Sequence, residues 1–231
     1  MNFPSAQNFI DLTHSFSPNI PCWDNDCCFT LHTEVDYKDC MPPNLFRVQN
    51  VEMKAGAGTH IDAPAHSIPG GTTIDRLALE NLCVDCVVIR VDDDAHDDEN
   101  YLVMPEAVTV FEKEHGMIQM NTFVIFYTGW DQYWNDPKKY CNDLQFPSVH
   151  ENTARLLIER NIAGLGIDTL SPDARGEDFP VHRVILGAGK YIVENIANAK
   201  NIPPTGAKIS IMPMKIKEGT EAPVRLVVYL L

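Results

Sequence analysis

Long apolar stretches are missing from this sequence. Its longest apolar runs, residues 122–127 and 224–231, are far shorter than the roughly 18 to 20 residues that cross a bilayer. Residues 1–8 also lack the basic start and apolar centre of a secretory signal, which favours a cytoplasmic protein. We therefore expect no membrane partner and a cytoplasmic location.

Basic residues are scarce as well, with 18 Lys and Arg against 32 Asp and Glu and a net charge of -14. Such a charge repels phosphate backbones, so nucleic acid is not an expected partner. Part of the charge lies in the acidic run at residues 92–99, which offers oxygen ligands for a cation. A solvated acidic loop after a strand is the favoured interpretation of that run.

Cysteine is present but forms no recognisable framework. The seven cysteines, an odd number, are scattered along the chain, which favours reduced thiols over a set of disulfides. The C-x-x-C pair of Cys83 and Cys86 has no second pair to complete a tetrahedral zinc site. We therefore expect no structural zinc knuckle at this pair.

The chain has no internal repeat, low-complexity tract or long linker, so we expect a single domain over residues 1–231. Pro105 and Gly116 mark the start and end of a helix, and Ser148 and Glu151 have the spacing of a capping box. Strands that alternate with helices predict a mixed α/β sheet. The expected strands are residues 9–13, 51–60, 84–91, 122–127, 163–167, 208–212 and 224–230, and the expected helices are residues 75–81, 105–115 and 148 to about 161.

The strongest chemical signal is the segment from Gly58 to His66, which reads GTHIDAPAH. In an extended chain His60 and Asp62 project to the same side, and Pro64 bends the chain so that His66 returns toward them. Imidazole and carboxylate ligands together suit zinc, manganese or iron. Ordinary polar residues at a strand end are the alternative that the spacing alone leaves open.

This segment resembles the signature of the Putative cyclase family of metal-dependent hydrolases, which includes bacterial kynurenine formamidase and isatin hydrolase. The family pattern reads H-x-G-T-H-x-D-x-P-x-H, and every fixed position from Gly58 onward is matched. The resemblance implies a swivelling β/β/α fold, a cyclase-like α/β single domain with a mixed sheet, and a homodimer. Further matches lie along most of the chain, at residues 11–14, 127–130 and 166–171 and at Asp173, His182 and Glu194.

The resemblance also implies a set of metal ligands. Asp62 matches an aspartate that bridges two metals in formamidase-like members, and His182 and Glu194 match the other ligands of one of them. His60 matches one of two histidines that hold the other metal. We expect His60 either to bind metal or to contact metal-bound water.

One position departs from the family pattern, because the first motif histidine is replaced by Gly56. A site that loses one of three protein ligands is weakened. We therefore expect a single zinc or manganese ion per chain, or two if another side chain, such as Glu52 or a cysteine, replaces the missing imidazole.

The activity implied by the resemblance is hydrolysis of a small aryl amide or formamide by metal-activated water. His66 is the expected proton shuttle, because its ordinary pKa lies near neutrality. Trp23 is the expected substrate-binding residue, stacked on a small-molecule substrate, with packing on the core as its alternative. Asp168, Ser171 and Asp173 follow a predicted strand, where they either act in the site or order the loop.

Two other functions remain open from the sequence. One is an isatin hydrolase-like lactam hydrolase or a cyclase, which differs from a formamidase in the shape of its pocket. The other is a degenerate, non-catalytic relative that binds a ligand, for which Gly56 would be the sign of decay.

Overall fold

Eight strands form the central sheet, and seven of them close into a barrel. A computed structural model describes residues 9–24, 27–96, 98–174, 176 and 178–230, so residues 1–8, on which the targeting expectation rests, lie outside it. The strand order is β1-β12-β11-β5-β7-β9-β10-β4, and β4 pairs a second time with β12 and so closes the ring. The strands are β1 (Phe9–Asp11), β4 (His60–Asp62), β5 (Cys83–Arg90), β7 (Phe123–Tyr127), β9 (Gly164–Ile167), β10 (Tyr191–Glu194), β11 (Ala207–Pro213) and β12 (Glu221–Leu230).

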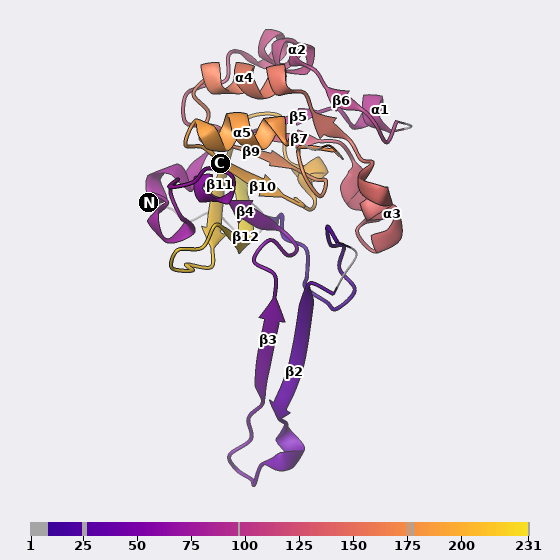
Figure 1. The fold of residues 1–231 in the computed structure, drawn as a ribbon, viewed down its shortest axis with the longest axis vertical. Helices are drawn as coiled ribbons and strands as arrows, with labels where there is room; N and C mark the ends of the chain where they lie inside the picture. The colour runs from indigo at the N-terminus through magenta and orange to yellow at the C-terminus, as the bar shows by residue number, and fades with distance from the viewer. Residues whose placement is uncertain (1–8, 25–26, 97, 175, 177, 231) are drawn as a thin grey trace.

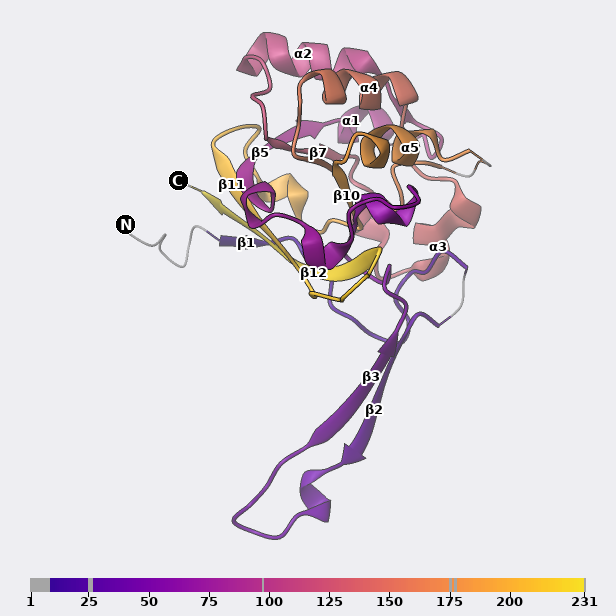
Figure 2. The ribbon, with the colours of Figure 1, turned by 60° about the vertical axis from the view of Figure 1, so that its left-hand side comes forward.

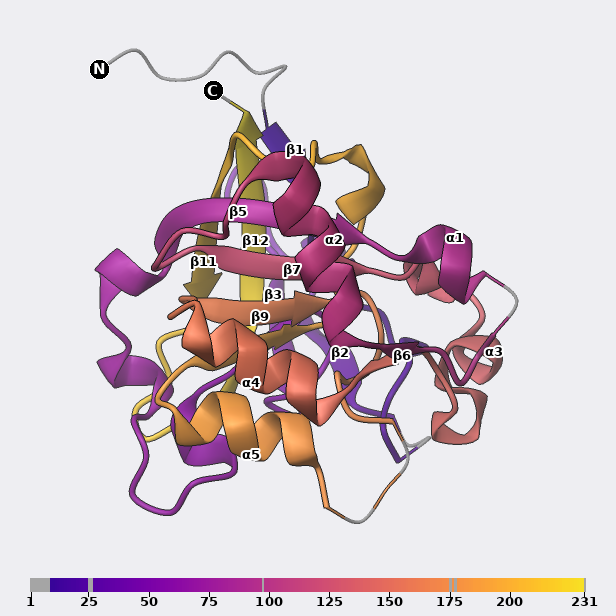
Figure 3. The same ribbon diagram turned by 90° about the horizontal axis from the view of Figure 1, so that it is seen from above.

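Helices cover the outer face of the parallel strands β5, β7, β9 and β10 (Figures 1 and 3). Strand β7 is buried on both faces, with Phe123 and Ile125 in the barrel interior and Val124 and Phe126 packed under the helices. Its apolar run is therefore continuous, as the sequence predicted. No described helix is long and apolar enough to cross a membrane. The helices are α1 (Asp92–Ala95), α2 (Pro105–His115), α3 (Pro137–Cys141), α4 (Glu151–Glu159) and α5 (Pro180–Gly187).

Two sequence-based helix predictions are corrected by the structure. Residues 75–81 form two short 3-10 turns, Ile74–Arg76 and Leu79–Asn81, because Leu77 between them is extended. The acidic run expected to be a loop begins with the single helical turn of α1, and Asp97 within that run lies outside the described residues.

The predicted capping box at Ser148 is also wrong. Ser148 belongs to the short strand β8 (Ser148–Val149), which pairs with β6 (Leu102–Val103). The N-cap of α4 is instead His150, whose Nδ1 accepts a hydrogen bond from the backbone N–H of Asn152 at 3.0 Å. The helix therefore begins at Glu151, two residues later than a capping box with Ser148 as the N-cap predicts.

A long hairpin of β2 (Phe29–Val35) and β3 (Val48–Met53) projects away from the barrel (Figures 1 and 2). The predicted strand at residues 51–60 is consequently two separate strands, β3 and β4. The chain turns between them, and Gly58 there has a φ of 63°, in the left-handed region that favours glycine.

The cysteines differ from the expectation at one pair. Cys22 and Cys28 form a disulfide, with their Cα atoms 6.2 Å apart, so the prediction of reduced thiols throughout is wrong. Within the described residues, the groups of side chains spaced to hold a metal ion contain no cysteine. The remaining cysteines are free: Cys27, Cys40, Cys83, Cys86 and Cys141.

Candidate metal centre

One imidazole and three carboxylate side chains meet on one face of the sheet around strand β4. Strand β4 lies between β10 and β12 and is antiparallel to both. Glu194 on β10 is directly opposite His60, and Glu221 on β12 is directly opposite Asp62. Residues directly opposite each other share a sheet face, as do His60 and Asp62, which are two apart. The closure of the barrel at β4 therefore creates the cluster.

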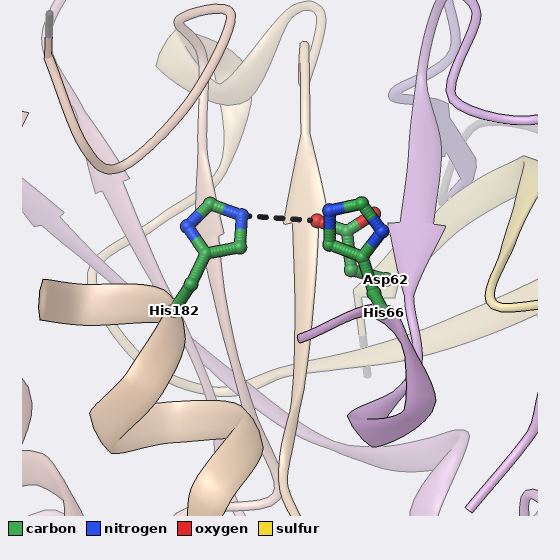
Figure 4. Close-up of side chains that lie close together, drawn as sticks. All are labelled: Asp62, His66 and His182. Carbon is green, nitrogen blue, oxygen red and sulfur yellow. Dashed lines mark ion pairs between the residues drawn. The ribbon is translucent and has the colours of Figure 1, made fainter. Parts of the chain in front are cut away.

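Two more histidines reach the cluster from helical turns. His182 comes from the first turn of α5, and His66 comes from the 3-10 turn η3 (Pro64–His66), where Pro64 ends the strand as predicted. Figure 4 shows both imidazoles beside Asp62, and their ring centroids are 5.8 Å apart. The structure therefore brings together the predicted residues His60, Asp62, His66, His182 and Glu194.

The distances place the Asp62 carboxylate between two imidazoles. His60 Nε2 lies 3.5 Å from Asp62 Oδ1 and 3.3 Å from Glu194 Oε2. His182 Nε2 lies 3.5 Å from Asp62 Oδ2 and 3.5 Å from Glu194 Oε1. Two histidines thus face the same two carboxylates through the same ring nitrogen.

The other nitrogen of each ring is held by a separate partner. His60 Nδ1 lies 2.8 Å from the carbonyl oxygen of Gly58, and His182 Nδ1 lies 2.7 Å from Asp173 Oδ2. A metal-binding histidine usually donates its second N–H to such a carbonyl or carboxylate, which fixes the ring orientation. Both rings are therefore held in the way that is usual for metal-binding histidines.

The protonation of the cluster follows from its burial and its carboxylates. Burial lowers the pKa of His60, but Glu194 and Asp62 outweigh burial and raise that pKa to about 9. Burial also lowers the pKa of His182, but Asp173, Asp62 and Glu194 outweigh burial and raise that pKa well above its usual value. Burial raises the pKa of Glu194, but His182 and His60 outweigh this effect and lower it. The carboxylates thus attract positive charge into a buried space.

The same residues fit a divalent cation. Asp62 Oδ1 and Glu194 Oε1 are buried and accept no hydrogen bond within the described residues. Leaving such oxygens unpaired is costly, so they indicate a missing partner. Two overlapping groups of ligand atoms, each within 4.8 Å of one another, share Asp62: one adds His66 and His182, and the other adds His60 and Glu221. Imidazole nitrogen and carboxylate oxygen are ligands that zinc and manganese accept.

The cluster opens into a cavity of about 550 Å³. Trp23 and Phe179 line its wall with their rings 5.9 Å apart, and Trp23 also contacts Phe146 at 6.5 Å. Trp23 is 36% exposed, packs on Phe146 and faces the cavity, so its packing on the core is observed and its stacking on a substrate stays a prediction. A cavity of this size suits a small organic molecule.

Comparison with known proteins identifies the family. The model of the Putative cyclase family matches residues 10–174, more than half of the chain. The chain belongs to the Putative cyclase family.

Relatives of this family member include an isatin hydrolase and a kynurenine formamidase. An isatin hydrolase from Roseibium aggregatum is 28% identical over 73% of this chain and 69% of the relative. A kynurenine formamidase from Salinibacter ruber is 25% identical over 94% of this chain and 95% of the relative. Among solved structures, isatin hydrolase A from Labrenzia aggregata, bound to benzyl benzoate, has a TM-score of 0.87 and 31% identity, covering 96% of this chain and 93% of that chain. The predicted family and the cyclase-like mixed α/β fold are confirmed.

The loop after β9 has two distinct roles in this family member. Asp168 is buried, and its Oδ1 accepts hydrogen bonds from the backbone N–H and the hydroxyl of Thr128. Burial raises the pKa of Asp168 to about 7. Asp168 does not line the cavity, so it orders the loop. Asp173 accepts hydrogen bonds from the backbone N–H groups of Val181 and His182 and also holds the His182 ring, so it orients a residue of the cluster.

Glu221 is a cluster residue that was not predicted from the sequence. Glu52, a predicted replacement for the missing imidazole, lies exposed on β3 and belongs to neither ligand group. The predicted strand at 224–230 starts too late, because Pro223 and the residues before it have the composition of a turn. In the sequence, Glu221 is only an acidic residue at the start of a strand. It can be assigned to the cluster only when the pairing of that strand with β4 is known.

Proposed function

We propose that this member of the Putative cyclase family is a metal-dependent hydrolase that cleaves a small aryl amide or formamide, in the manner of a kynurenine formamidase. The observation that carries the proposal is the Asp62 carboxylate, which lies between the Nε2 atoms of His60 and His182 with one oxygen lacking a hydrogen bond within the described residues. In this proposal His60, Asp62, His182 and Glu194 hold zinc or manganese, one or two ions per chain. When bound, such a cation lowers the pKa of water and polarises a carbonyl oxygen.

His66 is the proposed proton shuttle. Its side chain is 33% exposed at the cavity, and its Nδ1 lies 3.4 Å from Glu221 Oε2. The contact with Glu221 raises the pKa of His66 against the opposing effect of burial. The ring accepts the proton of the attacking water and delivers a proton to the leaving nitrogen, while Glu221 stabilises its charged form.

The cavity wall supports an aryl substrate. Trp23 and Phe179 provide aromatic surface beside the cluster, with the centroid of the Phe179 ring 5.9 Å from that of His182, and Lys54 and Arg183 line the same cavity. An aromatic ring stacked on Trp23 would bring its amide group toward Asp62, and a cation could pair with the carboxylate of an amino acid substrate such as N-formylkynurenine.

A lactam hydrolase is the second candidate, favoured by the 31% identity with isatin hydrolase A over nearly the whole chain. The test is hydrolysis of N-formylkynurenine, formanilide and isatin by protein treated with chelator and then reloaded with manganese or zinc. Faster turnover of the open-chain amides, restored only by metal, supports the formamidase assignment. Faster turnover of isatin supports the lactam assignment, and no metal-dependent turnover of any of them contradicts both.

We further propose that the protein is a homodimer in which the β2–β3 hairpin contacts a second copy. Two-stranded hairpins are at best marginally stable alone in water. Within the described residues these strands pair only with each other, yet Leu31 and Val51, opposite each other on the hairpin, are 50% and 52% exposed. A second copy would cover this apolar surface.

A further inference from the structure

The position of the missing motif histidine is occupied in space by another side chain. A Cβ atom added at Gly56 would overlap Glu221 Oε1 and would lie 3.2 Å from Glu221 Cδ. It would also lie 3.4 Å from His60 Nε2, the ring nitrogen that faces the cluster. The Glu221 carboxylate therefore occupies space that a side chain at position 56 would need, and such a side chain would displace the flexible end of Glu221 from the cluster.

The sheet also places Glu221 beside the other residues of the cluster. The register of β12 against β4 sets it directly opposite Asp62. Atoms of His60, Asp62 and Glu221 that are able to bind metal lie within 4.8 Å of one another. Ligand atoms that share one such ion are separated by roughly 3 to 4 Å, so small rotations of these side chains close the set.

We infer that Glu221 is a metal ligand that replaces the absent histidine, and that Gly56 is the substitution that makes room for it. The chain would then keep two adjacent sites that share Asp62, one with His60 and Glu221 and one with His182. The inference rests on the proposed function only in requiring a divalent cation. Glu221 then supplies the ligand that is absent at position 56, so the two positions compensate for each other.

A carboxylate in place of an imidazole changes the chemistry of this site. It adds a negative charge and a second oxygen donor to the set of His60 and Asp62. Oxygen-rich sites suit manganese and magnesium better than nitrogen-rich sites do, whereas imidazole favours zinc. We therefore expect the site to bind manganese better, relative to zinc, than a site with histidine at position 56.

The alternative role for Glu221 is to orient His66 without binding metal. Its two oxygens face different partners, since Oε2 lies 3.4 Å from His66 Nδ1 whereas Oε1 occupies the space beside Gly56. A positioning residue would change the pH profile of catalysis but not the affinity for metal. Metal binding therefore separates the two roles.

The test is a titration of the chelator-treated full-length protein with manganese and with zinc, followed by calorimetry and by the electron paramagnetic resonance of bound manganese. Glu221→Gln keeps the size of the side chain and removes its charge. We expect it to weaken one manganese site by at least about tenfold. The matched control is Asp24→Asn, which removes a cavity carboxylate that pairs with Lys54 outside the cluster and should leave both sites unchanged.

The decisive comparison exchanges the two residues. Gly56→His alone should lower manganese affinity, because the new side chain displaces the Glu221 carboxylate from the cluster. The double variant with Glu221→Gly should bind two metals, with its affinity ratio shifted toward zinc. Unchanged manganese affinity in Glu221→Gln, with two ions bound, overturns the inference and leaves the proposed function standing. A wild-type protein that binds neither metal overturns both.

Discussion

Asp173 holds the Nδ1 atom of His182 at 2.7 Å and, through the same carboxylate, accepts hydrogen bonds from the first backbone N–H groups of α5. One side chain thus fixes both the start of the helix and the ring that faces Asp62. The loop after β9 and the candidate metal centre are therefore connected through Asp173.

This relationship predicts the effect of Asp173→Asn. The amide still accepts a hydrogen bond from α5, but it no longer provides a negative charge beside the His182 ring. We expect metal affinity to fall about 10- to 100-fold, measured by competition with a chromogenic chelator. The control is Asp178→Asn, because Asp178 is mostly exposed in the same region. Equal affinity in the two variants would show that Asp173 only caps the helix.

His66→Ala should separate catalysis from metal binding. Removal of the proton shuttle should lower kcat by about 10²- to 10⁴-fold while the metal content stays at the wild-type value. Activity and elemental composition are measured on the same preparation. Loss of a metal ion together with activity would instead make His66 a ligand, as its place in the group with Asp62 and His182 permits.

Partly buried His14 should make the protein sensitive to acid. Its ring stacks on Trp134 with centroids 3.9 Å apart, and burial lowers its pKa to about 4. Between pH 6.5 and 4 the unfolded chain binds a proton that the folded chain does not, so folding stability falls as pH falls through this range. His14→Phe keeps the stacking and removes the titration.

The measurement is urea unfolding of wild type and His14→Phe at pH 7 and pH 4.5. Between these pH values we expect the wild type to lose on the order of 2 kcal/mol more than the variant. Parallel losses in the two proteins would show that His14 does not titrate abnormally.

The N-cap of α4 provides a test of local structure. His150→Ala should lower the free energy of unfolding by about 0.5 to 2 kcal/mol, because the N–H of Asn152 loses its acceptor. Ser148→Ala should leave this cap intact, because Ser148 lies in β8 outside the helix. Thermal unfolding of both variants shows which residue caps α4, and we expect the larger loss for His150→Ala. A larger loss of helical signal for Ser148→Ala would support the capping box instead.

The hairpin predicts the oligomeric state. The wild type should have twice its chain mass of 25.9 kDa in light scattering. Replacing both Leu31 and Val51 by Glu places like charges on the exposed apolar pair and should yield monomers with an unchanged melting transition of the barrel. A wild-type monomer, or a variant that remains a dimer, would remove the hairpin from the assembly.

Local patterns predicted the elements whose signals lie within a few residues. The apolar run at β7 and the Pro105–Gly116 boundaries of α2 are properties of short segments, and both were predicted correctly. The spacing of His60 and Asp62 likewise specifies one face of a strand. These features could be predicted without knowledge of contacts to distant segments.

Contacts between distant segments account for what the sequence did not predict. Glu221 becomes a cluster residue only through the register of β12 against β4, which no local pattern specifies. Ser148 has the correct spacing for a cap, but it pairs with Leu102 of β6 in a strand and therefore does not cap the helix. The break between β3 and β4 likewise depends on the hairpin leaving the barrel.

The central claim, a divalent cation held around Asp62, is tested most directly by the metal content of protein purified without chelators. We predict at least one zinc or manganese ion per chain in the wild type, lost in Asp62→Ala and retained in the surface variant Asp85→Asn. A folded wild-type protein with no bound metal, which also takes up none on dialysis against manganese or zinc, would contradict the account.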